Sequence, residues 1–274
     1  MKKKTNIGII GLGKMGEAIL HGAFSTKILK AKHIFFVAHH PKRDVLLKRK
    51  YKIQLSPTLQ DLCEKTKIIL LAVKPQDIPK VIAELKKYWD HHLLISIAAG
   101  METSYYKKHL GQNTKILRVL PNTPSRIGYG AAGYFATGSV SRQEKSFCEK
   151  LFSAIGIVVS IKKESQMNGV LAVSASGPAF IYEYARAVAQ AGCKLGLSKE
   201  QSRILTLETL HGATQMIRRD NFCIQNLIAQ VASKGGTTLA GLSILKKKGF
   251  TKIIEECMES SAKRARELNK KFGK

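Results

Sequence analysis

The stretch Thr5-Asn6-Ile7-Gly8-Ile9-Ile10-Gly11-Leu12-Gly13-Lys14-Met15-Gly16 determines the fold expected for this chain. Its first half is a short apolar run rich in β-branched residues, which is typical of a buried strand. Its second half has the spacing Gly-x-Gly-x-x-Gly, and Ala18 and Ile19 continue at helical spacing. Between a strand and a helix, such glycines allow a tight turn and close approach of a pyrophosphate. We therefore predict a Rossmann-type dinucleotide-binding unit, the alternative being a glycine-rich turn in an unrelated α/β fold.

Apolar runs of strand length recur up to Ile161, with helical patterns between them. Continuous apolar strands that alternate with helices predict a mainly parallel sheet covered on both faces. A capping box, Ser141-Arg142-Gln143-Glu144, opens a helix that is expected to end near Ala154. The expected strands are residues 5–10, 33–38, 51–55, 67–73, 93–98, 115–120, 128–137 and 157–161.

From Glu164 onward the pattern is helical. Gly177-Pro178 opens a long Ala-rich helix, Ser198-Lys199-Glu200-Gln201 caps the next, and residues 251–271 are charged and amphipathic. The predicted fold is therefore α/β, with a Rossmann-type dinucleotide-binding domain over residues 1–162 followed by an all-helical domain over residues 163–274.

Composition narrows the class of protein. The chain has 274 residues, of which 44% are hydrophobic and 24% charged, as in a globular protein. Its 5 cysteines form no Cys-x-x-Cys pair, which argues against a disulfide framework and fits a cytoplasmic location. The histidines lack metal-ligand spacing, so no metal is expected. Lys14 and Glu17 interrupt the apolar N-terminus, and residues 165–182 are too polar to span a membrane, so neither export nor a membrane anchor is expected.

The formal net charge of +27 is extreme. It is compatible with nucleic-acid or membrane binding, but the lysines are dispersed and are not interleaved with aromatic residues. We expect a solvated basic surface that attracts anionic ligands, and no nucleic-acid partner.

The end of the second expected strand bears on the choice of dinucleotide. A carboxylate there would accept a hydrogen bond from the ribose of NAD. This chain has His39-His40-Pro41-Lys42-Arg43 instead, with no acidic residue before Asp44. A polar, cationic corner suits a 2′-phosphate, so His40 and Lys42 are predicted to favour NADP, with NADPH preferred and NADH also allowed. The alternative is that Lys42 and Arg43 belong to a solvated helix start.

Two further segments follow predicted strands at the edge where open α/β sheets bind ligands. They are Ala72-Val73-Lys74-Pro75 and Ser96-Ile97-Ala98-Ala99-Gly100, and the small residues in both leave room for a nicotinamide ring. Asn122, after a later strand, is predicted either to face the cleft or to brace the turn around it.

Near the C-terminus, Ser233-Lys234-Gly235-Gly236-Thr237-Thr238 precedes an apolar segment of helical character. This pattern predicts a loop that leads into a helix N-terminus, where unpaired N–H groups can hold a carboxylate or a phosphate. Helix capping by a threonine is the alternative use of these residues.

Five segments together resemble the pyrroline-5-carboxylate reductase family over nearly the whole chain. The two most specific resemble the family signatures V-S-G-S-G-P-A-[FY] and S-P-G-G-T-T, although Ala175 and Lys234 depart from them. The five segments are residues 11–16, 72–76, 118–124, 174–180 and 233–238.

The resemblance implies NAD(P)H-dependent reduction of 1-pyrroline-5-carboxylate to proline. It implies that the helical domain interlocks with that of a second subunit in a homodimer, which allows further assembly into a ring. The implied substrate contacts are Glu164, Ser233, Gly235, Gly236, Thr237 and Thr238. The predicted cofactor contacts, which include His40 and Lys42 from the paragraph on the dinucleotide, are Ile10, Gly11, Leu12, Gly13, Lys14, Met15, Gly16, His40, Lys42, Ala72, Val73, Lys74, Pro75, Ala98 and Ala99.

The chemistry of these residues agrees with that reaction. Backbone N–H groups of the glycine loop can hold the substrate carboxylate, and the hydroxyl of Thr238 can donate to the imine nitrogen or relay a proton through water, which makes Thr238 the predicted catalytic residue. Two alternatives stay open: a related imine or β-hydroxyacid reductase of the same two-domain plan, and a non-catalytic dinucleotide- or nucleic-acid-binding protein.

Overall fold

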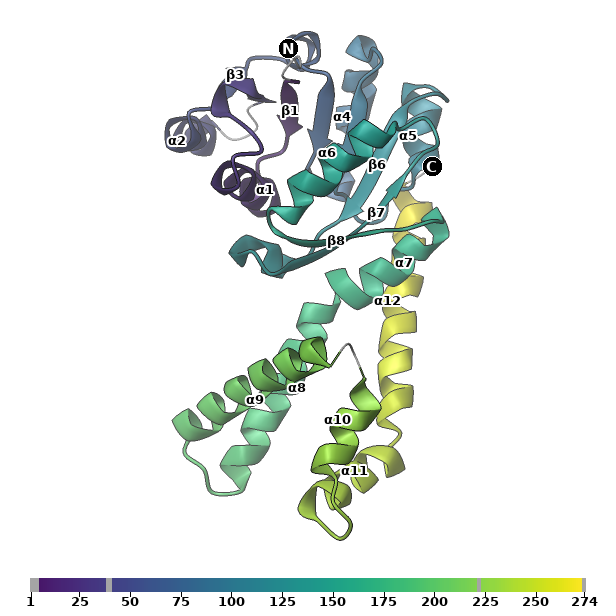
Figure 1. Ribbon diagram of the computed structural model, residues 1–274. Coiled ribbons are helices and arrows are strands. Elements are labelled where there is room, and N and C mark those ends of the chain that lie inside the picture. The colour runs from purple at the N-terminus through teal and green to yellow at the C-terminus, as the bar shows by residue number, and fades with distance from the viewer. Residues whose placement is uncertain (1–4, 38–40, 221–222, 273–274) are drawn as a thin grey trace. The chain divides into compact units, whose positions relative to one another are not determined.

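The computed structural model describes residues 5–37, 41–220 and 223–272 of the chain (Figure 1). They form two compact units. The first contains the residues up to Ser176 together with those from Ser260 onward, and the second is Gly177–Glu259. Helix α12 (Phe250–Phe272) therefore begins in the second unit and ends in the first.

The first unit is built on an 8-stranded sheet in the order β3-β2-β1-β4-β5-β6-β7-β8. All neighbouring strands are parallel except β6 and β7, which are antiparallel, so the prediction of a mainly parallel sheet is confirmed. The strands are β1 (Ile7–Ile10), β2 (Ile34–Val37), β3 (Gln54–Ser56), β4 (Ile68–Leu71), β5 (Leu93–Ser96), β6 (Lys115–Leu120), β7 (Gly130–Ala136) and β8 (Gly156–Ser160).

Helices cover both faces of this sheet because successive strand residues point to opposite sides. In β1, Ile7 and Ile9 join a core with α1 (Lys14–Ser25), α2 (Pro41–Tyr51) and α6 (Arg142–Ser153). Ile10 points the other way, into a core with α3 (Leu59–Lys65), α4 (Ile78–Leu85) and α5 (Thr103–Leu110). This two-sided burial explains why the strands are apolar without alternation.

Helices α3 and α5 are not among the elements predicted from the sequence. Thr58 caps α3, since its Oγ1 accepts a hydrogen bond from the backbone N–H of Asp61 at 3.1 Å. Both helices are short, with 7 and 8 residues, so they show little periodicity in the sequence.

The described residues of the second unit form helices and the turns between them, as predicted. It contains α8 (Gly177–Lys194), α9 (Lys199–Arg219), α10 (Ile224–Val231), α11 (Thr237–Lys247) and the first turns of α12. Figure 1 shows α8 and α9 packed side by side, and Ser202 Oγ on α9 donates to the carbonyl of Ala189 on α8 at 2.7 Å. The capping box predicted at Ser198 is present.

The change from strands to helices falls after Ser160, while the first compact unit continues to Ser176. The segment between them holds short η5 (Glu164–Gln166), α7 (Met167–Val170) and η6 (Leu171–Ala175), whose Met167 and Ala172 are buried. A domain boundary at residue 162 stays a prediction.

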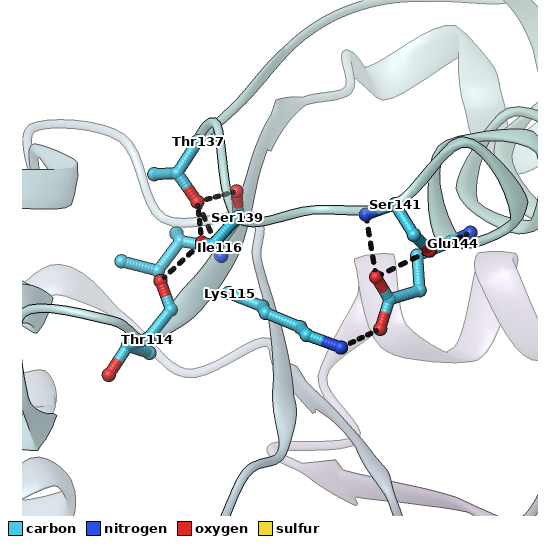
Figure 2. A network of polar contacts seen from close by, with 7 residues as sticks. All are labelled: Thr114, Lys115, Ile116, Thr137, Ser139, Ser141 and Glu144. Atoms are coloured by element: carbon cyan, nitrogen blue, oxygen red, sulfur yellow. Dashed lines mark hydrogen bonds and ion pairs between the residues drawn. The ribbon is translucent and has the colours of Figure 1, made fainter.

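The predicted capping box at Ser141 is also present, and Figure 2 shows how it joins the sheet. One carboxylate oxygen of Glu144 accepts from the N–H and hydroxyl of Ser141, and the other accepts from Lys115 Nζ of β6 at 2.9 Å. Burial opposes ionisation of Glu144, but these hydrogen bonds outweigh it and leave the pKa of its carboxyl below the ordinary value. The carboxylate therefore ties the start of α6 to β6.

We expect Glu144→Ala to lower the free energy of unfolding by about 1–2 kcal/mol at pH 7, because the carboxylate half of the capping box and a half-buried ion pair are both lost. Since the folded pKa lies below the unfolded one, the stabilisation is present above the ordinary glutamate pKa of about 4.3 and is lost as the pH falls through the lowered folded value. Urea unfolding of both proteins at pH 7 and pH 3.5 checks this. Glu144→Gln keeps the cap acceptor and should lose less, and an equal loss for Glu144→Ala at both pH values contradicts the prediction.

Candidate functional site

The glycine loop follows β1 at the carboxyl end of the sheet. Gly11 has φ +92°, a left-handed conformation that favours glycine. A Cβ atom at Gly11 would lie 2.7 Å from Val73 Cγ1 and 2.8 Å from the carbonyl oxygen of Ala72. The loop after β1 therefore packs directly on the loop after β4, and any larger residue at this position would separate them.

Gly13 forms the N-cap of α1 and has free space beside its backbone. A Cβ atom there would meet no described atom within 4 Å, so the space beside Gly13 is open. No side chain from the described part of the chain caps α1. The first N–H groups of a 12-residue helix thus face an open space with the positive end of the helix dipole behind them. A dinucleotide pyrophosphate fits this arrangement.

The order of the strands places this loop at the switch point of the sheet. β1 pairs with β2 on one side and with β4 on the other, with Ile10 opposite Leu71. The N–H of Ala72 donates to the carbonyl of Ile10 at 2.8 Å. In open α/β sheets, the crevice at such a point holds the ligand.

The predicted cofactor segments lie at the carboxyl ends of neighbouring strands. Ile10–Gly16 starts at the last residue of β1, Ala72–Pro75 follows β4, and Ala98 with Ala99 follows β5, which pairs with β4. Ala98 is buried, whereas Lys74 is exposed. The fold therefore brings these three segments to one edge of the sheet.

The predicted cationic corner is described in part. His40 lies outside the described residues, and Lys42 lies in the first turn of α2. Arg43 forms an ion pair with Glu17 of α1 at 3.3 Å. Hydrogen bonds from Lys50, at 2.9 Å, and Tyr51, at 3.0 Å, reach the same carboxylate, and that from Lys50 is the main cause of the lowered pKa of Glu17. Glu17 thus fixes α2 against α1.

Glu164 lies in η5 and is engaged within the first unit. Its Oε1 accepts from the backbone N–H of Thr103 at 2.8 Å and from Arg118 at 3.2 Å, and its Oε2 accepts from Thr103 Oγ1. Arg118 is 1% exposed. Sequence reasoning missed this cluster, although an arginine inside an apolar strand is itself a signal, because a buried charge needs a partner.

The loop at residues 233–238 lies in the second unit. The N–H of Gly236 donates to the carbonyl of Ser233 at 3.0 Å, Gly235 has φ +76°, and α11 begins at Thr237 with Gly236 as its N-cap. No side chain of a described residue caps this helix, so threonine capping is not what the structure shows. Thr237 and Thr238 occupy the first two helical positions and are exposed.

Comparison with known proteins identifies the family. A pyrroline-5-carboxylate reductase of Bacillus subtilis (strain 168) is 33% identical over 273 residues, which cover 99% of this chain and 97% of that protein. The chain belongs to the pyrroline-5-carboxylate reductase family. The family model described as "Pyrroline-5-carboxylate reductase dimerisation" matches residues 164–268, and "NADP oxidoreductase coenzyme F420-dependent" matches residues 6–100.

Solved structures of the pyrroline-5-carboxylate reductase family agree with the fold. That of Coxiella burnetii has a TM-score of 0.90 at 30% identity and covers 97% of this chain and 99% of that one. A pyrroline carboxylate reductase of Plasmodium falciparum with NADP bound has a TM-score of 0.85, also at 30% identity, over 97% and 98% of the two chains. This chain thus has a Rossmann-type domain followed by an all-helical dimerisation domain.

Two signature segments of this family member support the fold next to the site. The side chain of Asn122, after β6, accepts from the N–H of Ala131 at 3.0 Å and donates to the carbonyl of Ser174 at 3.2 Å. Ser174 Oγ donates to the carbonyl of Ala131 at 2.5 Å. Of the two roles predicted for Asn122, the structure shows the bracing one.

Two further features, metal centres and membrane spans, concern residues 5–37, 41–220 and 223–272. No group of three or more His, Cys, Asp or Glu side chains in these ranges is placed to hold a metal ion. Among the helices of the same ranges, none combines the length and apolarity needed to cross a bilayer.

Proposed function

We propose that this chain reduces 1-pyrroline-5-carboxylate to L-proline by hydride transfer from NADPH, the last step of proline biosynthesis. The observation that carries the proposal is the uncapped N-terminus of α1 beside the open space at Gly13, in a chain similar to these reductases over 99% of its length. The same site suits a dinucleotide phosphate.

For the cofactor, we propose that the pyrophosphate binds the N–H groups of the loop from Ile10 to Gly16. The nicotinamide would lie toward Ala72–Pro75 and toward Ala98 with Ala99, where small side chains leave room. His40 and Lys42 would attract the 2′-phosphate, and NADPH would therefore be preferred to NADH. When bound, NADPH supplies the hydride, while the chain holds the two reactants in position.

For the substrate, we propose that its carboxylate binds the N–H groups at Gly235, Gly236 and Thr237, next to Ser233. The uncapped start of α11, which has no acidic residue in its first turn, supports an anion at this place. The hydroxyl of Thr238 would donate to the imine nitrogen or relay a proton to it. The substrate contact predicted for Glu164 competes with the three hydrogen bonds it already accepts, so the loop is the main substrate site.

For assembly, we propose a homodimer in which the C-terminal helices of two copies interlock, with further association of dimers into a ring. The second unit supports this because it exposes many large apolar side chains, which a dimer would bury. Among these are Ile181, Tyr182, Tyr184, Leu195, Ile204, Leu205, Ile244, Leu245 and Ile253. Thr238 would then meet the cofactor of the partner subunit. A cytoplasmic location is consistent with the five free cysteines.

The direct test is kinetic. With purified protein, we expect loss of NADPH absorbance only when 1-pyrroline-5-carboxylate is present, formation of proline in equal amount, and a higher kcat/KM with NADPH than with NADH. Turnover of an acyclic imine or of a β-hydroxyacid, with none of the pyrroline, would replace this function by that of a related reductase. NADPH or DNA binding without turnover of any of these substrates would indicate a non-catalytic protein.

A further inference from the structure

The loop between β5 and α5, Ala98–Glu102, links the cofactor edge of the sheet to the rest of the first unit. Ala98 and Ala99 are at its start, where the nicotinamide is proposed to bind. Gly100 has φ +75°, and Met101 is fully buried. The loop is held from two sides by residues far away in the sequence.

The C-terminal end of the loop is held by the Glu164 cluster, which consists of Glu164, Thr103 and Arg118. The carboxylate accepts from both the N–H and the hydroxyl of Thr103, which directly follows the loop. Arg118, buried in β6, provides the countercharge at 3.2 Å. Removing Glu164 would take away the countercharge of the buried Arg118, so the geometry is strongly determined.

The loop also contacts the last part of α12, which belongs to the same unit. Asn269 Nδ2 donates to Glu102 Oε1 at 2.9 Å. A Cβ atom at Gly100 would lie 3.0 Å from Leu268 Cβ, so the loop and helix are in close contact. Asn269 is 9% exposed and Glu102 is exposed, so this hydrogen bond is buried at the asparagine end only.

The start of the loop is also held by hydrogen bonds. Ser96 Oγ at the end of β5 forms a hydrogen bond with Tyr106 OH of α5 at 2.7 Å and accepts from the N–H of Ala98 at 3.4 Å. Because hydrogen bonds hold both the start and the end of the loop, the backbone at Ala98 and Ala99 has little freedom to shift.

We propose that Glu164 and Asn269 are positioning residues that hold the Ala98–Glu102 loop in the shape that receives the nicotinamide of NADPH. The proposal rests on the cofactor placement given above. Neither residue is assigned a contact with the cofactor, so each acts through the backbone of the loop. Because a displacement of about 1 Å can cost about 100-fold in rate, a loosened loop should weaken NADPH binding and lower kcat together.

The pair Glu102 and Asn269 offers a reversible test. Asn269→Asp places two carboxylates together and should raise the Kd for NADPH about 10-fold, through loss of one hydrogen bond and added repulsion. The double variant Glu102→Gln with Asn269→Asp restores a donor and an acceptor in exchanged positions, and its Kd should return to within about 3-fold of the original. Binding is measured by calorimetry with NADPH alone, and kcat and both KM values with the pyrroline.

Controls separate positioning from stability and from the proposed reaction. Arg264→Ala breaks the exposed Arg264–Glu267 pair on the same helix and should change none of these values. Glu164→Gln keeps the shape of Glu164 and should raise the Kd for NADPH. If the wild-type protein binds NADPH but does not reduce the pyrroline, the proposed function is wrong. The Kd values of the variants for NADPH would still test the role of the loop.

Two results would overturn the proposal. One is an unchanged Kd and kcat in Asn269→Asp, whether or not the melting temperature falls. The other is a Glu164→Gln variant in which only the KM for the pyrroline rises, because that result would make Glu164 a substrate ligand.

Discussion

Gly13→Val is expected to lower the affinity for NADPH at least about 100-fold while leaving the fold intact. The valine side chain would enter the open space at the start of α1 and exclude the pyrophosphate from its N–H groups. Each hydrogen bond to a charged group contributes about 1.5–3 kcal/mol, so the loss of two accounts for that factor. The φ of −72° at Gly13 suits any residue, and a poorer N-cap costs about 1 kcal/mol. Calorimetry with NADPH and thermal unfolding measure the two effects.

Gly138→Val is the matched control for this variant. Gly138 is also exposed, and a Cβ atom there would also meet no described atom within 4 Å, but it lies in the turn after β7, away from the glycine loop. This control should bind NADPH as the original protein does. Equal NADPH affinity in Gly13→Val and Gly138→Val would place the cofactor elsewhere.

Thr238→Ala is expected to reduce kcat about 100-fold or more and to leave the Kd for NADPH unchanged. The hydroxyl is the proposed hydrogen-bond donor to the imine nitrogen, and a positioned proton donor typically contributes at least about 100-fold. Because Thr238 is exposed at the start of α11 and does not cap it, its removal should not destabilise the helix. Steady-state kinetics with the pyrroline and calorimetry with NADPH check both parts.

Two variants sharpen this test. Thr238→Ser keeps the hydroxyl and should retain most of the activity. Ser243→Ala removes another hydroxyl from the same helix, one that donates to the carbonyl of Ala240 at 2.7 Å, and should leave kcat unchanged. A kcat in Thr238→Ala close to that of the original protein would remove Thr238 from the mechanism.

Much of the fold was predictable because its signals are local. The strands are continuous apolar runs, and both capping boxes at Ser141 and Ser198 lie within four consecutive residues. Helix α5 was not predicted: its 8 residues are Thr-Ser-Tyr-Tyr-Lys-Lys-His-Leu, and contacts of Tyr105 and Tyr106 with the core stabilise it more than local propensity does.

The candidate site likewise combines features that the sequence predicted with features that only the structure shows. The glycine loop was predictable, since the turn at Gly11 and the helix start at Gly13 depend on residues next to each other in sequence. For Asn122 the sequence left two roles open, and only the structure shows the bracing one, because its two partners, Ala131 and Ser174, are 9 and 52 residues away.

By itself, the sequence determined that this protein has a dinucleotide-binding α/β domain followed by helices, because glycine conformations, strand apolarity and helix caps act over a few residues. Only the tertiary structure decided what surrounds the edge of the sheet where we propose that the nicotinamide binds. Glu164 meets Thr103 across 61 residues, and Asn269 meets Glu102 across 167. Such pairs form because a buried charge or polar group must find a partner, and which partner is in reach is decided by the packing of the whole unit.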